Sequence, residues 1–238
     1  NMTRYAIFIL TIFLAGLSVG CASSPAGKTA MLKLHTRSME RAPGTKQKDG
    51  RYRPVLKTVQ WAPEKTALVI CDMWDRHWCK GAEARVAEMA PEMNQLAETA
   101  RSLGVQIIHA PSTCVDFYKD TPQRKRAITS AFSSAPVELS RKERWGTAWC
   151  WPQDEREPAM PIDDSDMGCD CEKKCEIVPP WTRQIKTIDI REPDVITDNG
   201  QETYNLLSEK GIDNVILMGV HLNMCVLGRP FAIRQMVN

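Results

Sequence analysis

Short apolar runs alternate with amphipathic stretches over the C-terminal two thirds of the chain. Buried strands are predicted at residues 66–71, 105–110 and 215–218, because each is a short apolar run closed by a polar or turn residue. Residues 82–103 and 200–210 have helical periodicity, and a glycine follows each of them. Strands alternating with helices predict an α/β fold with a doubly wound, mostly parallel sheet in a three-layer α/β/α arrangement.

Other parts of the pattern are less regular. Residues 116–181 are rich in prolines, charges and turn residues, which predicts a long irregular insertion with one helix near residues 123–132. After it, residues 184–190 alternate like a strand, and residues 230–236 begin another helix. We therefore expect one α/β domain over residues 64–238 that carries an insertion.

The N-terminus has the pattern of a secretory signal. A basic residue precedes the apolar run 5–17, small residues follow, and the run is short for a membrane span. Residues 1–21 are predicted to be a signal peptide. Gly20-Cys21 resembles a bacterial lipoprotein processing site, which would attach a lipid to Cys21; ordinary export and an uncleaved anchor are the alternatives. The expected location is periplasmic or membrane-anchored by lipid.

Composition narrows the classes of partner. Residues 22–63 are rich in Ser, Gly, Pro and basic residues, which predicts a tether or a loosely packed arm. The formal net charge of +2 is too weak to indicate nucleic-acid binding, and the four histidines lack metal-ligand spacing. We expect a small-molecule substrate, no cofactor and no metal, and the sequence leaves a homo-oligomer open.

Three candidate functional residues fall at predicted strand ends. Asp72 and His109 close the first two strands, and Cys225 follows the third after a short turn. Parallel sheets place their sites beyond the carboxyl ends of the strands, so we expect these side chains near one another. A thiol at a helix start is also where backbone N–H groups and the macrodipole favour a thiolate.

The strand that ends at Asp72 and the segment 211–226, Gly-Ile-Asp-Asn-Val-Ile-Leu-Met-Gly-Val-His-Leu-Asn-Met-Cys-Val, resemble the isochorismatase-like cysteine hydrolases. That family includes nicotinamidases and N-carbamoyl amide hydrolases. The resemblance runs from about residue 65 to the end, apart from the insertion, and its specific part is Gly-Val-x4-Cys-Val. Family members carry a further strand and helix, which this chain would lack.

The resemblance implies a role for several residues. Cys225 would be the nucleophile, Asp72 the general base and Lys186 the lysine of the family's catalytic set. The backbone N–H groups of His221 and Cys225 would form the oxyanion hole, and a cis peptide bond would fall at Val220-His221. The implied reaction is hydrolysis of a small amide or related carbonyl compound through a thioester.

The side chains of Trp74, His77, Trp78 and His109 are predicted to line the substrate pocket. Asp75-Arg-His77 has the letters of the nicotinamidase metal pair, but it follows the first strand rather than a later one. We therefore predict no metal there. His109 has a second interpretation as a hydrogen-bonded histidine at a strand end.

Two other functions remain open: a non-catalytic binding module of the same fold, and vinyl-ether hydrolysis of the isochorismatase type, which does not need the cysteine. Each site residue also has a structural alternative. Cys225 would be a small buried hydrophobe, Asp72 a helix cap, and Lys186 an exposed residue on an edge strand. The position of Lys186 relative to the Cys225 sulfur is expected to discriminate among these interpretations.

The chain contains nine cysteines, which is high for its length. With Cys21, Cys71 and Cys225 set aside, six remain: Cys79, Cys114, Cys150, Cys169, Cys171 and Cys175. If the protein is exported, the oxidising compartment favours disulfides between these cysteines, and the sequence does not determine the pairing. The group at 169–175 is also a candidate metal site, but it lacks the usual Cys-x2-Cys pair.

Overall fold

The computed structural model describes residues 30–44, 52–152, 157, 162–163, 165 and 167–238. The predicted signal peptide and Cys21 lie outside these residues. Within the described part of the chain, no helix is both long and apolar enough to span a membrane.

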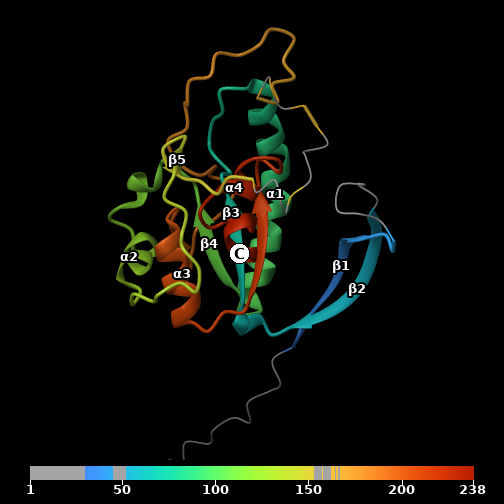
Figure 1. Ribbon diagram of the computed structural model, residues 1–238. Helices are drawn as coiled ribbons and strands as arrows, with labels where there is room; N and C mark the ends of the chain where they lie inside the picture. Colours follow the sequence, from blue (N-terminus) through green and yellow to red (C-terminus); the bar gives the residue numbers. More distant parts are fainter. Residues whose placement is uncertain (1–29, 45–51, 153–156, 158–161, 164, 166) are drawn as a thin grey trace, which may run out of the picture.

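A four-stranded parallel sheet forms the centre of the domain (Figure 1). Its order is β7-β4-β3-β8, with bounds β3 (Thr66–Cys71), β4 (Gln106–Ala110), β7 (Val195–Ile196) and β8 (Asn214–Gly219). The register places Cys71 beside Ala110 on one side and Gly219 on the other. The carboxyl ends of the three longest strands therefore meet at one edge, and the predicted α/β fold is confirmed.

Helices pack against this sheet. Their bounds are α1 (Lys80–Ser102), α2 (Pro122–Thr129), α3 (Gly200–Glu209), α4 (Cys225–Gly228) and α5 (Ile233–Val237). In β3, Leu68 and Ile70 face α1, whereas Ala67 and Val69 face the side of α2, α3 and α4. This alternation follows from the two-residue period of a strand and explains why every residue of β3 is buried.

The strand expected at residues 184–190 is wrong. Gln184 makes a single bridge with Trp74, and the chain then turns so that the Gln184 side chain donates to the carbonyl of Ile188. Gln184 and Ile188 are buried while the residues between them are more exposed, which produces the misleading alternation. The strand beside β4 is instead the short β7.

Residues 32–61 are not a loose tether. They contain an antiparallel hairpin of β1 (Leu32–Arg41) and β2 (Tyr52–Trp61), which extends from one side of the domain (Figure 1). Leu32 packs against the apolar cluster beneath α1, where the hairpin joins the domain. Partly buried residues are separated by exposed polar ones along both strands, as in a two-stranded antiparallel hairpin. The polar composition alone had suggested a tether.

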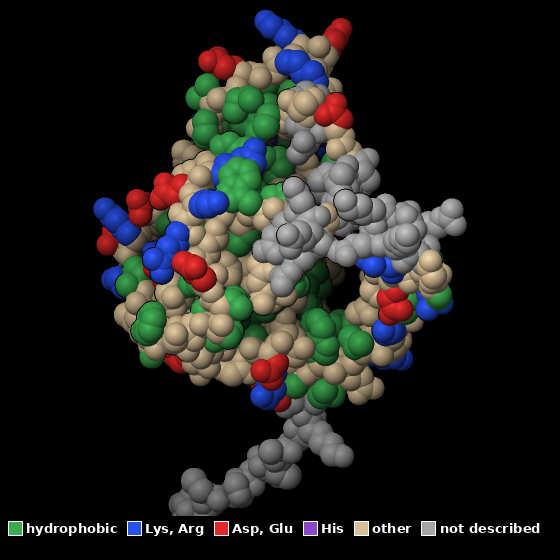
Figure 2. All heavy atoms as spheres, viewed as in Figure 1, with side chains coloured by type: hydrophobic (Ala, Val, Ile, Leu, Met, Phe, Trp, Pro, Cys, Tyr) green, Lys and Arg blue, Asp and Glu red, His purple; other side chains and the backbone are tan. Residues whose placement is uncertain are grey.

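The insertion is mostly irregular, as expected, and includes α2, the 3-10 turn η2 (Val115–Tyr118) and a small hairpin of β5 (Glu143–Arg144) and β6 (Thr147–Ala148). Trp149 follows this hairpin and packs directly on α4, where a Cβ added to Gly228 would lie 2.3 Å from the indole ring. On the face shown in Figure 2, basic and acidic side chains are interspersed, in keeping with the small net charge.

Candidate active site

A cavity of about 360 Å³ opens at the carboxyl edge of the sheet. Four tryptophans line much of it: Trp74, Trp78, Trp145 and Trp181. The rings of Trp74 and Trp181 are stacked, with centroids 4.1 Å apart and planes 6° apart. Cys225 and Arg229 also line the cavity, so a largely aromatic chamber contains one thiol and one guanidinium.

Asp72 lies directly after β3 and is fully buried. Its backbone has a φ of 50°, a left-handed conformation that aspartate tolerates better than most residues. One carboxylate oxygen accepts the backbone N–H of Ser112 at 2.8 Å, and the other accepts Nε of Arg229 at 3.0 Å. The carboxylate is thus held from two sides and does not cap the helix, whose N-cap is Cys79.

Arg229 is the cation of this site, and the sequence prediction missed it. Only 1 % of the residue is exposed, and a buried guanidinium requires a partner of opposite charge. Burial opposes its charge, but the Asp72 carboxylate outweighs this and raises the pKa of Arg229. A second bond from the guanidinium to the Thr147 hydroxyl ties the insertion to the site. Its position four residues after Cys225 was the available signal.

Cys225 is the first residue of α4 and is 3 % exposed. Burial, followed by the neighbouring Asp72 carboxylate, raises the pKa of the thiol to about 12, although Arg229 and the backbone N–H of His221 oppose this. The resting group is therefore a neutral thiol close to the Asp72 carboxylate, and its sulfur lies 4.0 Å from Nδ1 of His221. A thiolate favoured by the helix start is therefore not what burial and the Asp72 charge produce, and α4, with only four residues, has little dipole to oppose them.

The turn before Cys225 has the predicted backbone geometry. The peptide bond between Val220 and His221 is cis. The backbone N–H of His221 points at the Cys225 sulfur, and the N–H of Cys225 has no hydrogen-bond acceptor within the part of the chain that is described. The Cys225 N–H is therefore available beside the thiol, at the place expected for an oxyanion hole, and the His221 N–H would join it only by leaving the sulfur.

Lys186 is not brought to this site. It is exposed in the turn between Gln184 and Ile188, and it is not among the residues that line the cavity. Gln184 and Ile188, at the two ends of the turn, are buried, whereas Lys186 between them is exposed to solvent. The role that the resemblance gave to a lysine is not met by this residue, and the charge beside Asp72 comes from Arg229 instead.

His109 also differs from its predicted role as a pocket residue. It is fully buried, but it does not line the cavity. Its Nδ1 lies 2.9 Å from the Gln184 amide oxygen, and its Nε2 lies 3.0 Å from a carboxylate oxygen of Asp194. Arg101 from α1 binds the same carboxylate at 2.7 Å. His109 is thus the hydrogen-bonded histidine of a structural network.

The remaining pocket residues lie where they were expected. Trp74, His77 and Trp78 all line the cavity. The rings of His77 and His221 meet edge to face, with centroids 5.0 Å apart. Burial, followed by the neighbouring His221, lowers the pKa of His77 to about 4, and burial lowers that of His221 too. Both imidazoles are neutral near pH 7, which favours an uncharged ligand beside them.

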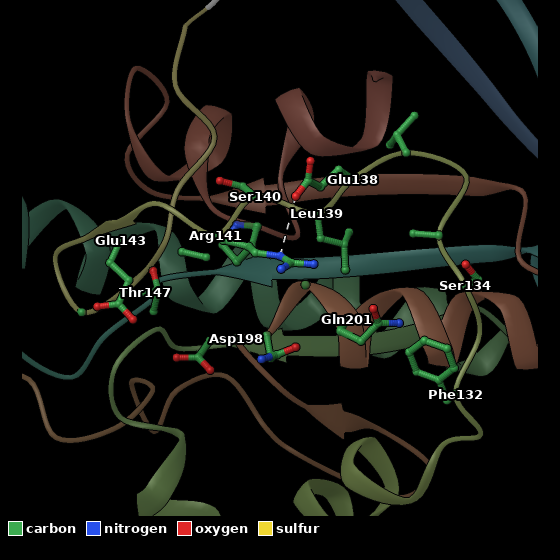
Figure 3. A pocket seen from close by; sticks show the side chains of 17 residues that line it. Phe132, Ser134, Glu138, Leu139, Ser140, Arg141, Glu143, Thr147, Asp198 and Gln201 are labelled. Atoms are coloured by element: carbon green, nitrogen blue, oxygen red, sulfur yellow. Dashed lines mark ion pairs between the residues drawn. The ribbon is translucent and has the colours of Figure 1, made fainter.

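A second carboxylate, which the sequence prediction also missed, belongs to Asp198 just after β7. It accepts the backbone N–H of Thr113 at 2.8 Å, and burial followed by the Asp72 charge raises its pKa. Asp198 also lines a more polar hollow of about 620 Å³, shown in Figure 3, whose wall includes Gln201 and Thr147. This hollow shares Gly146 with the aromatic cavity.

No disulfide is present among the described cysteines, all eight of which are free thiols. Cys114 donates to the Pro111 carbonyl and Cys150 to the Gln235 side chain, each at 3.2 Å. These two thiols occupy separate buried environments and are not paired with each other. The structure therefore does not contain the expected disulfides among the described residues.

Comparison with protein-family models and with curated proteins found no match to this chain. The resemblance to isochorismatase-like hydrolases therefore stays a prediction, carried by the residues quoted from the sequence.

Proposed function

We propose that the protein is a cysteine hydrolase of the isochorismatase-like type, with a three-layer α/β/α fold, that cleaves a small amide or related carbonyl compound. One observation carries the proposal: the Cys225 thiol lines an aromatic cavity, and the fully buried Asp72 carboxylate, held by Arg229, is close enough to raise the pKa of that thiol. A thiol, a base that is fixed in place and backbone N–H donors beside the thiol are the parts that acyl transfer needs.

The residues suggest the following sequence of bonds. Asp72 takes the thiol proton as the Cys225 sulfur attacks the carbonyl carbon, and a carbon–sulfur bond forms. The carbonyl oxygen becomes negative beside the N–H groups of His221 and Cys225. When the intermediate collapses, the carbon–nitrogen bond breaks and Asp72 returns its proton to the leaving amine. Water then attacks the thioester with Asp72 again as base, and the acid and the thiol are released.

Arg229 would act as a positioning residue in this scheme. It holds one carboxylate oxygen of Asp72 and balances the negative charge. The other carboxylate oxygen would then accept the thiol proton. A guanidinium stays charged throughout the reaction, and the proton therefore moves only between Cys225, Asp72 and the leaving group. This would replace the lysine that the resemblance implies.

The cavity favours a small, flat and uncharged substrate. Its volume lies near the lower end of the range for ligand sites. Stacked indoles such as Trp74 and Trp181 suit a planar group, and the neutral His77 and His221 provide hydrogen bonds without charge. An aromatic or conjugated amide is the substrate class that fits best.

A non-catalytic binding module is the second candidate, because the resting thiol has a high pKa and Lys186 is exposed. Ammonia release from a panel of small aliphatic and aromatic amides distinguishes the two. We expect turnover that Cys225→Ala abolishes and that Cys150→Ser, a change at another buried thiol, retains. Saturable binding without turnover would support the module, and ammonia release that survives Cys225→Ala would exclude covalent catalysis by the cysteine.

We also propose that the protein is exported, as the N-terminal sequence pattern predicts. Mass determination of the mature N-terminus in a bacterial host tests this. Cleavage before Cys21 with an added diacylglycerol would support the lipoprotein, cleavage without lipid would support ordinary export, and an intact N-terminus would contradict both.

A further inference from the structure

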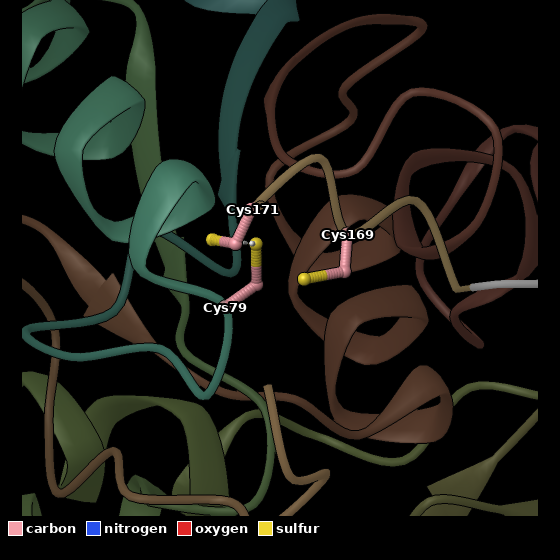
Figure 4. Close-up of side chains that lie close together, drawn as sticks. All are labelled: Cys79, Cys169 and Cys171. Atoms are coloured by element: carbon pink, nitrogen blue, oxygen red, sulfur yellow. Dashed lines mark hydrogen bonds between the residues drawn. The ribbon is translucent and has the colours of Figure 1, made fainter. Parts of the chain in front are cut away.

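Cys79, Cys169 and Cys171 gather where the insertion meets the start of α1 (Figure 4), and Cys175 follows in the same loop. Cys79 is the N-cap of the helix, and Cys169, Cys171 and Cys175 come from one loop. The sulfur atoms of Cys79, Cys169 and Cys171 all lie within 4.8 Å of one another. The Cys175 thiol is close to those of Cys169 and Cys171 but lies outside the group whose sulfurs are all within 4.8 Å of one another, so it is the candidate fourth ligand.

The spacing of these sulfurs suits a shared ion rather than bonds between pairs. The sulfurs of Cys79 and Cys171 are 3.9 Å apart, about twice the length of a disulfide. Zinc holds thiolates at about 2.3 Å in a tetrahedron, which places neighbouring sulfurs about 3.8 Å apart. Each thiol also has more than one sulfur neighbour, an arrangement that two separate disulfides do not need.

Backbone N–H groups point at the same sulfurs. The first turn of α1 supplies two of them, from Lys80 to the Cys175 sulfur and from Ala82 to the Cys79 sulfur. The N–H groups of Cys171 and Cys175 both point at Cys169. Such bonds offset the negative charge of thiolates and orient them, as expected around a metal centre.

The loop is fixed by contacts that do not involve the thiols. Asp170 binds Arg85 of α1 at 2.8 Å, and the Lys174 ammonium binds the Cys169 carbonyl. The cysteine loop lies so close to α1 that a Cβ on Gly81 would be 2.4 Å from a carboxylate oxygen of Asp170. The four sulfurs are therefore positioned by the surrounding chain, which lowers the ordering cost of binding an ion.

We propose that Cys79, Cys169, Cys171 and Cys175 bind a structural zinc ion. Four thiolates complete a tetrahedral shell and leave no open position for water or substrate, so the ion would stabilise rather than catalyse. The site is formed by residues far apart in the sequence, which is why the loop spacing alone did not reveal it. It is an alternative to the expectation that the chain has no metal site and that these cysteines form disulfides.

The position of the site gives the ion a specific structural task. His77 and Trp78 precede Cys79 and line the aromatic cavity, and Ile177 and Trp181, which follow the cysteine loop, line it too. An ion bound to both segments would cross-link these two parts of the cavity walls. This inference does not depend on the proposed hydrolase activity, because any ligand of the cavity would need the same walls.

Metal analysis of the full chain, purified without chelators, tests the proposal. We expect one zinc per chain after exhaustive dialysis, and after exchange with Co²⁺ we expect the strong visible and near-ultraviolet absorption of a tetrahedral thiolate site. Cys171→Ser should lose at least half of the bound metal and alter the Co²⁺ spectrum. Cys150→Ser, which changes a buried thiol outside the group, should retain both signals.

Peptide mapping under non-reducing conditions provides a readout that does not need a folded variant. With zinc bound, the four thiols should resist alkylation in the wild-type protein until a chelator is added. The proposal is overturned if the wild-type chain retains no zinc and gives no cobalt thiolate bands. Disulfides within the group of four, found in freshly purified protein, would overturn it as well.

Discussion

At the scale of single residues, the site depends on how three buried groups share charge. Asp72 binds Arg229 on one side and meets the neutral Cys225 thiol on the other. A thiol with a pKa of about 12 is a weak nucleophile on its own, and it becomes useful only if its proton leaves as the sulfur attacks. The proposed chemistry therefore depends on the carboxylate as a base more than on a preformed thiolate.

Replacing each of the two candidate cations in turn by methionine tests this arrangement. Arg229→Met leaves the Asp72 charge buried without its partner, which should lower the free energy of unfolding by roughly 3–5 kcal/mol and abolish turnover. Lys186→Met changes an exposed side chain and should alter stability by no more than about 0.5 kcal/mol. Urea unfolding and amide hydrolysis measure both effects. Loss of turnover in Lys186→Met alone would restore the lysine to the mechanism.

At the scale of elements, a buried polar network fixes the strands that carry the site. Asp194, just before β7, binds His109 of β4 and Arg101 of α1. Burial opposes ionisation of this carboxyl, but the bonds from His109 and Arg101 outweigh it and lower its pKa to about 2. The network thereby links one helix and two strands at the side of the sheet away from β8.

This network predicts how stability depends on pH. Because the folded pKa of Asp194 is below the unfolded value of about 3.9, its contribution is complete above pH 4 and is lost as the pH falls towards 2. The loss amounts to roughly 2–3 kcal/mol at most. Asp194→Asn should be less stable near neutral pH and should show a shallower decline in acid. Urea unfolding between pH 2 and 7 measures this, and parallel curves for the two proteins would contradict it.

At the scale of the whole molecule, local patterns predicted β3, β4, α1 and α3 because their periodicity and burial agree along the chain. The same patterns failed where contacts between distant segments decide the outcome. Lys186 and Arg229 could not be ranked from sequence, since only the fold shows which cation is buried. The sequence marked the cysteines at 169–175 as a candidate metal site but did not add Cys79, which lies 92 residues before its neighbour Cys171.

The central claim, that Asp72 takes the proton of Cys225, is tested most directly by the rate at which iodoacetamide alkylates Cys225 at pH 7. Wild-type protein and Asp72→Asn are compared by peptide mapping, with labelling of Cys114 and circular dichroism as controls for folding. If the carboxylate acts only through its charge, its removal lowers the pKa of the thiol and speeds alkylation, since Asp72 raises that pKa. If it acts as a base, alkylation of Cys225 should slow by roughly tenfold or more in the variant. Slower labelling is what we predict, and equal or faster labelling would contradict the account.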